Sequence, residues 1–180
     1  LEHPCQALAD YLTIQEQFGN LKGLNLTYIG DGNNVANSLI ICGAMLGVNV
    51  KICSPNGFEV DPKIVEKAKS LSEFGAKISI SNEPSKAVKE AQVIYTDVWS
   101  SMGQEEEQAR RKEIFINYKV DEKLINLADE EVIILHCLPA HRGEEITEEA
   151  LEGPNSYVFD QAENRLHVQQ ALLAVQLGGL

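Results

Sequence analysis

The sequence predicts a doubly wound α/β fold, in which a parallel sheet of about five strands is flanked by helices on both faces. Strand-like and helix-like segments alternate along the chain without tandem hairpins, as parallel sheets require. The apolar run at residues 132–135 has the length of a strand that is covered on both faces. The 180 residues are enough for one domain with a proper core.

The first predicted elements are a helix over residues 4–18 and a strand over residues 24–29. Pro4 suits the first turn of a helix, and apolar side chains fall near one helical face. The glycines of residues 30–32 then turn the chain into a helix over about residues 34–47.

The later elements repeat this alternation. Asp61 is predicted to cap the helix that it begins, because an aspartate accepts hydrogen bonds from first-turn N–H groups. The remaining helices are predicted at 61–74, 84–91, 104–112, 123–128 and 162–177, and the remaining strands at 48–53, 78–81, 93–96, 132–135 and 157–159. No repeat or low-complexity linker divides them, so we predict one α/β domain.

The charge balance limits the kinds of partner. Fifteen Lys and Arg residues against 27 Asp and Glu residues give a formal net charge of −12. Nucleic acids and anionic membranes attract clustered positive charge, which this chain lacks, so we predict binding to neither. No apolar stretch approaches the ~20 residues of a membrane span, and no signal peptide opens the sequence.

The cysteines indicate a reducing, cytoplasmic setting. They form no Cys-x-x-Cys pair, and they stand at Cys5, Cys42, Cys53 and Cys137. Apolar neighbours favour buried positions for Cys42 and Cys53. Zinc bound by His136, Cys137 and His141 would lack a fourth ligand, so we predict no metal site.

Polar residues follow most of the predicted strands. Ligands of open parallel sheets bind beyond the carboxyl ends of the strands, near the reversal of strand order. This rule selects residues 30–34, Ser54, residues 97–103, residues 136–138 and residues 160–165. We therefore expect a small-molecule site at this edge.

The Gly-Asp-Gly-Asn-Asn segment at residues 30–34 lacks the other features of a dinucleotide-binding motif. Val35 stands at the third glycine position, and no acidic residue ends the second strand. The segment is either a tight turn that needs glycine, or a helix N-terminus where Asn33 and Asn34 offer amides to a polar ligand.

Other candidate side chains have two interpretations each. His3 and Gln6 lie three apart at a helix start, where they contact one ligand or His3 only caps the helix. Asp97 at a strand end either binds an ammonium group or caps a helix. Cys137 is an inert core residue, a nucleophile or a proton-handling group, and His136 must point the opposite way.

The remaining acidic pairs and runs have a simpler interpretation. The glutamates at 105–107 and at 144–145 are predicted to lie on solvated faces.

Five segments occur in a characteristic order. They are HPCQ at 3–6, GDGNN at 30–34, DVWSSMGQE at 97–105, HCLPAHRG at 136–143 and FDQAENR at 159–165. Together they resemble the ornithine carbamoyltransferase family over nearly the whole chain. The SMG loop at 101–103 is similar to the signature of the branch that accepts ornithine. The resemblance implies a Rossmann-like ornithine-binding domain.

The resemblance also implies a reaction. The family transfers a carbamoyl group from carbamoyl phosphate to the δ-amine of L-ornithine, giving L-citrulline and phosphate, without metal or organic cofactor. Its first domain holds carbamoyl phosphate with a Ser-x-Arg-Thr loop, which this sequence lacks. We therefore expect a cut domain that is inactive alone, with an inter-domain helix at 1–18, the ornithine-binding domain at 24–160 and a helix at 162–180 that returns to the absent domain.

Carbamoyl phosphate would be contacted by residues at both ends of the chain. The resemblance implies that His3, Gln6 and Arg165 bind it, with His3 donating to the carbonyl oxygen, where negative charge develops. Cys137 and Leu138 would line the junction of the two substrates. Cys137 would act as a proton acceptor or a positioning group, and with His3 and Arg165 it makes up the implied catalytic set.

Ornithine would be held at the middle of the chain. The resemblance implies that Asn34 binds the α-carboxylate, that Asp97 pairs with the α-ammonium beside the Ser101 hydroxyl, and that the Met102 backbone completes the carboxylate contact. Two alternatives stay open: a carbamoyltransferase for a related amine such as putrescine or lysine, and a stand-alone amino-acid-binding module.

The sequence of the last helix predicts that the fragment self-associates. Family members are commonly homotrimers, so the resemblance implies a homotrimer for the full-length protein. Leu166, Leu173 and Leu177 form one apolar line that the absent domain would cover. We expect this surface to be exposed in the fragment and to promote self-association.

Overall fold

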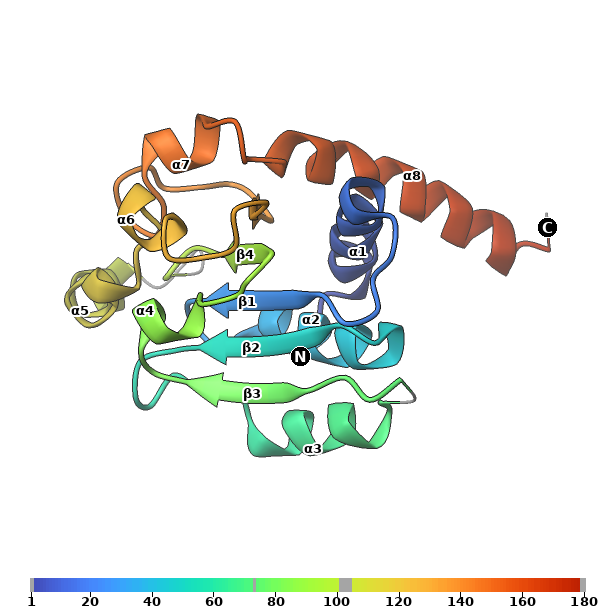
Figure 1. The fold of residues 1–180 in the computed structure, drawn as a ribbon, viewed down its shortest axis with the longest axis horizontal. Coiled ribbons are helices and arrows are strands. Elements are labelled where there is room, and N and C mark those ends of the chain that lie inside the picture. Colours follow the sequence, from blue (N-terminus) through green and yellow to red (C-terminus); the bar gives the residue numbers. More distant parts are fainter. Residues whose placement is uncertain (1, 73, 101–104, 179–180) are drawn as a thin grey trace.

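The computed structural model of the chain confirms the doubly wound α/β fold (Figure 1). It describes residues 2–72, 74–100 and 105–178. Five strands, all paired in parallel, lie in the order β3-β2-β1-β4-β5. They are β1 (Asn25–Ile29), β2 (Asn49–Cys53), β3 (Ile78–Ser81), β4 (Val93–Thr96) and β5 (Ile133–His136).

Helices connect the strands, as the alternation of sequence patterns predicts. They are α1 (Pro4–Phe18), α2 (Asn34–Leu46), α3 (Pro62–Ser70), α4 (Pro84–Ala87), α5 (Glu105–Phe115), the 3-10 turn η1 (Ile116–Tyr118), α6 (Glu122–Ile125), α7 (Glu148–Glu152) and α8 (Val158–Gln176). The helices α3 and α4 end several residues earlier than predicted. Within the described ranges, no helix combines the length and the apolar character needed to cross a membrane.

Two apolar cores lie on the two faces of the sheet. Val93 and Tyr95 of β4 belong to the core under α1, α2 and α3, whereas Ile94 belongs to the core that includes residues of α4, α6 and α7. Strand β5 alternates in the same way, with Ile134 on the second face. Successive strand side chains point to opposite faces, so two covered faces explain the uninterrupted apolar run in β5.

Side-chain caps fix the starts of several helices. The Asp61 carboxylate accepts a hydrogen bond from the N–H of Lys63 (2.9 Å), which confirms the predicted cap of α3. The sequence did not predict α7. Its cap is Thr147, whose hydroxyl accepts from the N–H of Ala150 (3.2 Å).

The predicted strand at residues 157–159 is wrong. Ser156 forms only an isolated parallel bridge with Ile134, and Val158 already begins α8. The Val158 side chain is fully buried in the second core from the first turn of this helix, while Phe159 is exposed. The apolar Tyr-Val-Phe run therefore forms the start of a helix, and the buried Val158 side chain anchors this helix in the core.

Helices α1 and α8, from opposite ends of the chain, pack together (Figure 1). Asn164 Nδ2 donates to Thr13 Oγ1 (3.0 Å) and to Glu16 Oε2 (2.7 Å). Beyond this contact α8 exposes large apolar side chains, including Leu166 (57%), Leu173 (60%) and Leu177 (83%). The apolar surface expected on this helix is therefore present.

Candidate functional site

The strand order reverses between β1 and β4, whose carboxyl ends meet at one edge of the sheet. Ile29 pairs with Thr96, so Gly30 and Asp97 leave the two strands side by side. Cys137 follows β5, the other neighbour of β4. The structure thus brings together three of the strand ends that the sequence rule selects.

The turn after β1 requires both of its glycines. Gly30 has φ +149, a conformation that side chains with a Cβ rarely adopt. At Gly32 an added Cβ would overlap the backbone of Glu59 and Val60. This supports the tight-turn interpretation of the segment.

Asn33 acts within the protein. Its Oδ1 accepts hydrogen bonds from the N–H groups of Val35 (2.9 Å) and Ala36 (3.1 Å), which caps α2. Its Nδ2 donates to Asp97 Oδ2 (2.7 Å). Asn33 therefore orients Asp97, a role that the sequence did not indicate, while Asn34 is exposed in the first turn of α2.

Asp97 is a buried carboxylate held by neutral donors. It is 7% exposed, and besides Asn33 it accepts from the N–H of Val98 (2.8 Å) and from the Cys137 thiol (3.0 Å). These contacts place it at the edge of the sheet, and within the described part of the chain none of them caps a helix. Neutral donors leave its charge uncompensated, which suits a ligand ammonium group.

Cys137 is a neutral thiol in this environment. Burial, and next the Asp97 carboxylate, raise the pKa of Cys137 well above its ordinary value. The thiol therefore keeps its proton at neutral pH and donates it to Asp97 in a hydrogen bond. A protonated thiol neither attacks as a nucleophile nor accepts a proton, which favours the positioning role for Cys137.

A buried pair, His136 and Glu145, lies behind Cys137. His136 Nδ1 accepts from the N–H of Leu138 (2.8 Å), so Nε2 carries the hydrogen and donates to Glu145 Oε1 (3.1 Å). The prediction that Glu145 is solvated is wrong, because its side chain is fully buried by this contact. Leu138, with φ +51, is thereby held in a sharp turn.

His3 and Arg165 come close together although they lie on opposite ends of the sequence. Burial, and next the Arg165 charge, lower the pKa of His3, while Asp97 acts in the opposite direction. His3 is therefore a neutral imidazole near neutral pH. His3 stands at the N-cap of α1, where its carbonyl accepts from the N–H of Ala7 (3.2 Å), but among the described residues its side chain makes no capping bond. Its backbone N–H donates to Ser38 Oγ (2.7 Å).

Arg165 has hydrogen-bonding capacity to spare. Its Nη1 donates to Gln6 Oε1 (2.6 Å), whereas its buried Nε has no partner among the described residues. An unpartnered buried N–H is costly. The guanidinium group as a whole suits ligand oxygens, because its planar donors match carbonyl and phosphate groups. Gln6 is itself buried, and its Nε2 donates to Asp10 (2.8 Å), so the protein engages both of its polar atoms.

Among the residues that the structure describes, two groups of side chains come near enough to hold a metal ion. The first is Asp97, His136 and Cys137, and the second is His141, Glu144 and Glu145. In the first group both ring nitrogens of His136 are already engaged, and Cys137 is a protonated thiol. In the second, Glu144 pairs with Lys112 (2.6 Å) and Glu145 with His136. Most of the side chains in the two groups thus already interact with other protein groups.

For three residues that the sequence assigns to the site, Ser54, Ser101 and Met102, the structure gives no contact with the site residues above. Ser101 and Met102 lie outside the described residues. Ser54 is buried at the end of β2, where its carbonyl accepts from the Tyr118 hydroxyl (3.3 Å).

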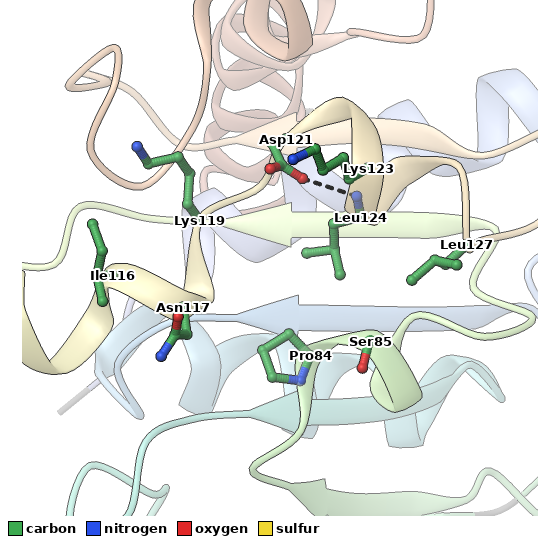
Figure 2. A pocket seen from close by; sticks show the side chains of 9 residues that line it. All are labelled: Pro84, Ser85, Ile116, Asn117, Lys119, Asp121, Lys123, Leu124 and Leu127. Carbon is green, nitrogen blue, oxygen red and sulfur yellow. Dashed lines mark hydrogen bonds between the residues drawn. The ribbon is translucent and has the colours of Figure 1, made fainter.

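A separate hollow lies between α4, η1 and α6 (Figure 2). Lys119 and Lys123 flank it, and Leu124 and Leu127 line it. The Asp121 carboxylate accepts from the N–H of Leu124 (2.9 Å), so it caps α6. No residue of the carboxyl edge described above lines this hollow.

Known proteins match this chain along its length. Residues 22–176 match the family model of the Asp/Orn binding domain of aspartate/ornithine carbamoyltransferase. Ornithine carbamoyltransferase from Prochlorococcus marinus is 67% identical over 180 residues, which are 100% of this chain and 57% of the relative. The enzyme from Thermococcus kodakarensis is 52% identical, covering 99% of this chain and 57% of its own length.

Solved structures agree with this match. Ornithine carbamoyltransferase from Pyrococcus furiosus superposes with a TM-score of 0.95 at 51% identity, over 100% of this chain and 58% of that one. The chain thus spans somewhat more than half the length of the relatives it matches. It belongs to the aspartate/ornithine carbamoyltransferase family and corresponds to the Asp/Orn binding domain.

Proposed function

We propose that this chain is the ornithine-binding part of an ornithine carbamoyltransferase, which converts carbamoyl phosphate and L-ornithine to L-citrulline and phosphate. The observation that supports this most is the buried Asp97 carboxylate, held by Asn33 and Cys137 beside the exposed Asn34. It offers an uncompensated negative charge to an amino-acid ammonium group. The names of the relatives support the same substrate.

Ornithine binds with its α-ammonium on Asp97 and its α-carboxylate near Asn34, with Ser101 and Met102 completing the contacts. The δ-amine then reaches toward Cys137 and Leu138. Because the Cys137 thiol is protonated, it positions this amine and does not take its proton. Asp97 stays paired with the α-ammonium, so the proton that the δ-amine loses as the C–N bond forms leaves with the phosphate.

Carbamoyl phosphate binds on the other wall of the site, at His3, Gln6 and Arg165. A neutral His3 can donate one N–H to the carbonyl oxygen. The δ-amine attacks the carbonyl carbon, negative charge collects on that oxygen, and the C–O bond to phosphate breaks. The Arg165 guanidinium, which Gln6 orients, suits the departing phosphate oxygens.

The rest of the protein completes the enzyme. We propose that the remaining domain supplies the phosphate loop, that the full-length protein is a homotrimer, and that this chain alone is inactive. The four free cysteines support a cytoplasmic location, where thiols stay reduced.

The direct test joins this chain to the part of the Prochlorococcus marinus relative that it does not cover, and measures citrulline formation. We expect activity with ornithine and little with lysine or putrescine. Asp97→Asn should lower kcat/KM for ornithine about 100-fold, because a buried charge pair contributes about 3 kcal/mol.

Glu66→Gln is the matched control, since it makes the same change at an exposed carboxylate on α3. It should leave kcat/KM unchanged. Equal activity with putrescine would refute the α-amino-acid assignment, and a fully folded hybrid without transfer activity would refute the proposed reaction.

A further inference from the structure

A buried carboxylate with no role in the mechanism above lies between α1 and α8. Asp10 is fully buried, and its Oδ1 accepts hydrogen bonds from Gln6 Nε2 (2.8 Å) and Gln161 Nε2 (2.6 Å). Its Oδ2 has no partner among the described residues. Burying a carboxylate is costly, so the hydrogen bonds that Asp10 makes must offset that cost or serve a function.

Asp10 sets the orientation of two amides. Asp10 Oδ1 accepts both hydrogen bonds, in the ionised form and equally in the neutral form with its proton on Oδ2, so both glutamines turn their NH₂ groups toward it. Their oxygens then face outward. Gln6 Oε1 accepts from Arg165 Nη1 (2.6 Å), and Gln161 Oε1 accepts from the backbone N–H of His136 (3.0 Å). An amide turned the other way would present NH₂ to these donors and lose both bonds.

The two branches end on the two walls of the site. One fixes the guanidinium of Arg165, the residue assigned to carbamoyl phosphate. The other fixes the start of residues 136–138, the turn that carries Cys137 and Leu138. Both glutamines are buried, at 2% and 0% exposure, so water does not replace the missing partner if Asp10 is removed.

We propose that Asp10 is a positioning residue for carbamoyl transfer, which holds Arg165 and the 136–138 turn in place through the amides of Gln6 and Gln161. It touches neither substrate. The inference rests on the proposed function, because that function assigns carbamoyl phosphate to Arg165.

The test uses the hybrid enzyme with two substitutions at this position. Asp10→Leu has a similar branched shape but accepts no hydrogen bond, so both amides are free to turn. We expect KM for carbamoyl phosphate to rise on the order of 10- to 100-fold, since small misplacements of a binding group have effects of this size. KM for ornithine should change less, because Asp97 and Asn34, which hold its α-groups, are not bonded to these amides among the described residues, whereas kcat should fall because the 136–138 turn carries Cys137. Asp10→Asn, whose Oδ1 can accept both bonds, should restore most of the lost affinity.

Two results would overturn the inference: an unchanged KM for carbamoyl phosphate in Asp10→Leu, or an Asp10→Asn variant as impaired as Asp10→Leu. An unmodified hybrid that is folded but inactive contradicts the proposed function instead. In that case crystal structures of the unmodified and the Asp10→Leu chains still test whether Asp10 positions Arg165. The inference requires the Arg165–Gln6 contact to be lost in the variant and contradicts its retention. If Asp10→Leu does not fold, the structure of Asp10→Asn must keep both amide orientations.

Discussion

Replacing Asp10 with asparagine should change how the stability of the chain depends on pH. Burial raises the pKa of Asp10 to about 7 from 3.8, although hydrogen bonds from Gln6 and Gln161, the nearby Tyr95 hydroxyl and the charge of Arg165 act in the opposite direction. The titratable or charged groups that interact with it are Arg165 on α8, Tyr95 on β4, Cys42 on α2, Cys137 after β5 and Tyr11 on α1.

The magnitude follows from the difference between these two pKa values. It is about three pK units, and each unit corresponds to about 1.4 kcal/mol, so the effect is about 4 kcal/mol. Between pH 4 and 7 the folded chain holds the Asp10 proton more tightly than the unfolded chain does. The free energy of unfolding therefore falls through this group as pH rises across that window, and it levels off above pH 7.

The assay is urea unfolding at several pH values, followed by the fluorescence of Trp99, which is the single tryptophan and is buried. Asp10→Asn removes the titration, so the stability of the variant relative to the unmodified chain should increase by about 4 kcal/mol from pH 4 to pH 8. The exposed-site control Glu66→Gln should show no such trend. A difference between Asp10→Asn and the unmodified chain that is constant across this range would refute the reasoning.

Three further changes have clear expected outcomes. Asn33→Ala removes the cap of α2 and a donor to Asp97. The free energy of unfolding should fall by about 1 kcal/mol, and calorimetry should show weaker ornithine binding. Unchanged ornithine affinity would contradict the role of Asn33. The double substitution Leu173→Glu and Leu177→Glu should reduce self-association, measured by light scattering, and should reduce the binding of a hydrophobic dye. An unmodified chain that is monomeric would contradict this expectation. Iodoacetamide at pH 8 should alkylate Cys137 much more slowly than it alkylates free glutathione, because the pKa of Cys137 is raised. Mass spectrometry can follow the labelling. Rapid labelling of Cys137 would show a thiolate and contradict this expectation.

The sequence predicts the edge of the sheet that forms the site, because that prediction needs only the strand ends. Asp97 and Cys137 each follow a short apolar run, and parallel strands bring their carboxyl ends to one edge. The alternation of elements likewise fixes the fold class. The strand predicted at 157–159 fails because a three-residue apolar run has no period that separates a strand from the first turn of a helix.

The sequence does not reveal which residues form hydrogen bonds with the buried polar side chains. Asn33 and Asp97 lie 64 residues apart, and Gln161 and Asp10 lie 151 apart. Local patterns carry no information on such pairs, since either residue alone is typical of a solvated turn or helix. Glu145 shows the same limit, because its neighbour Glu144 suggests a charged surface while its own side chain is buried.

The most direct test of the site is the two-dimensional ¹⁵N–¹H NMR spectrum of this chain titrated with L-ornithine. Weak binding is sufficient for this measurement. We expect the largest shifts at the amides of residues 31–36, 97–98 and 137–138, and their loss in Asp97→Asn. Shifts confined to the hollow of Figure 2, around Asn117, Lys119 and Lys123, would contradict the placement of ornithine at the carboxyl edge of the sheet.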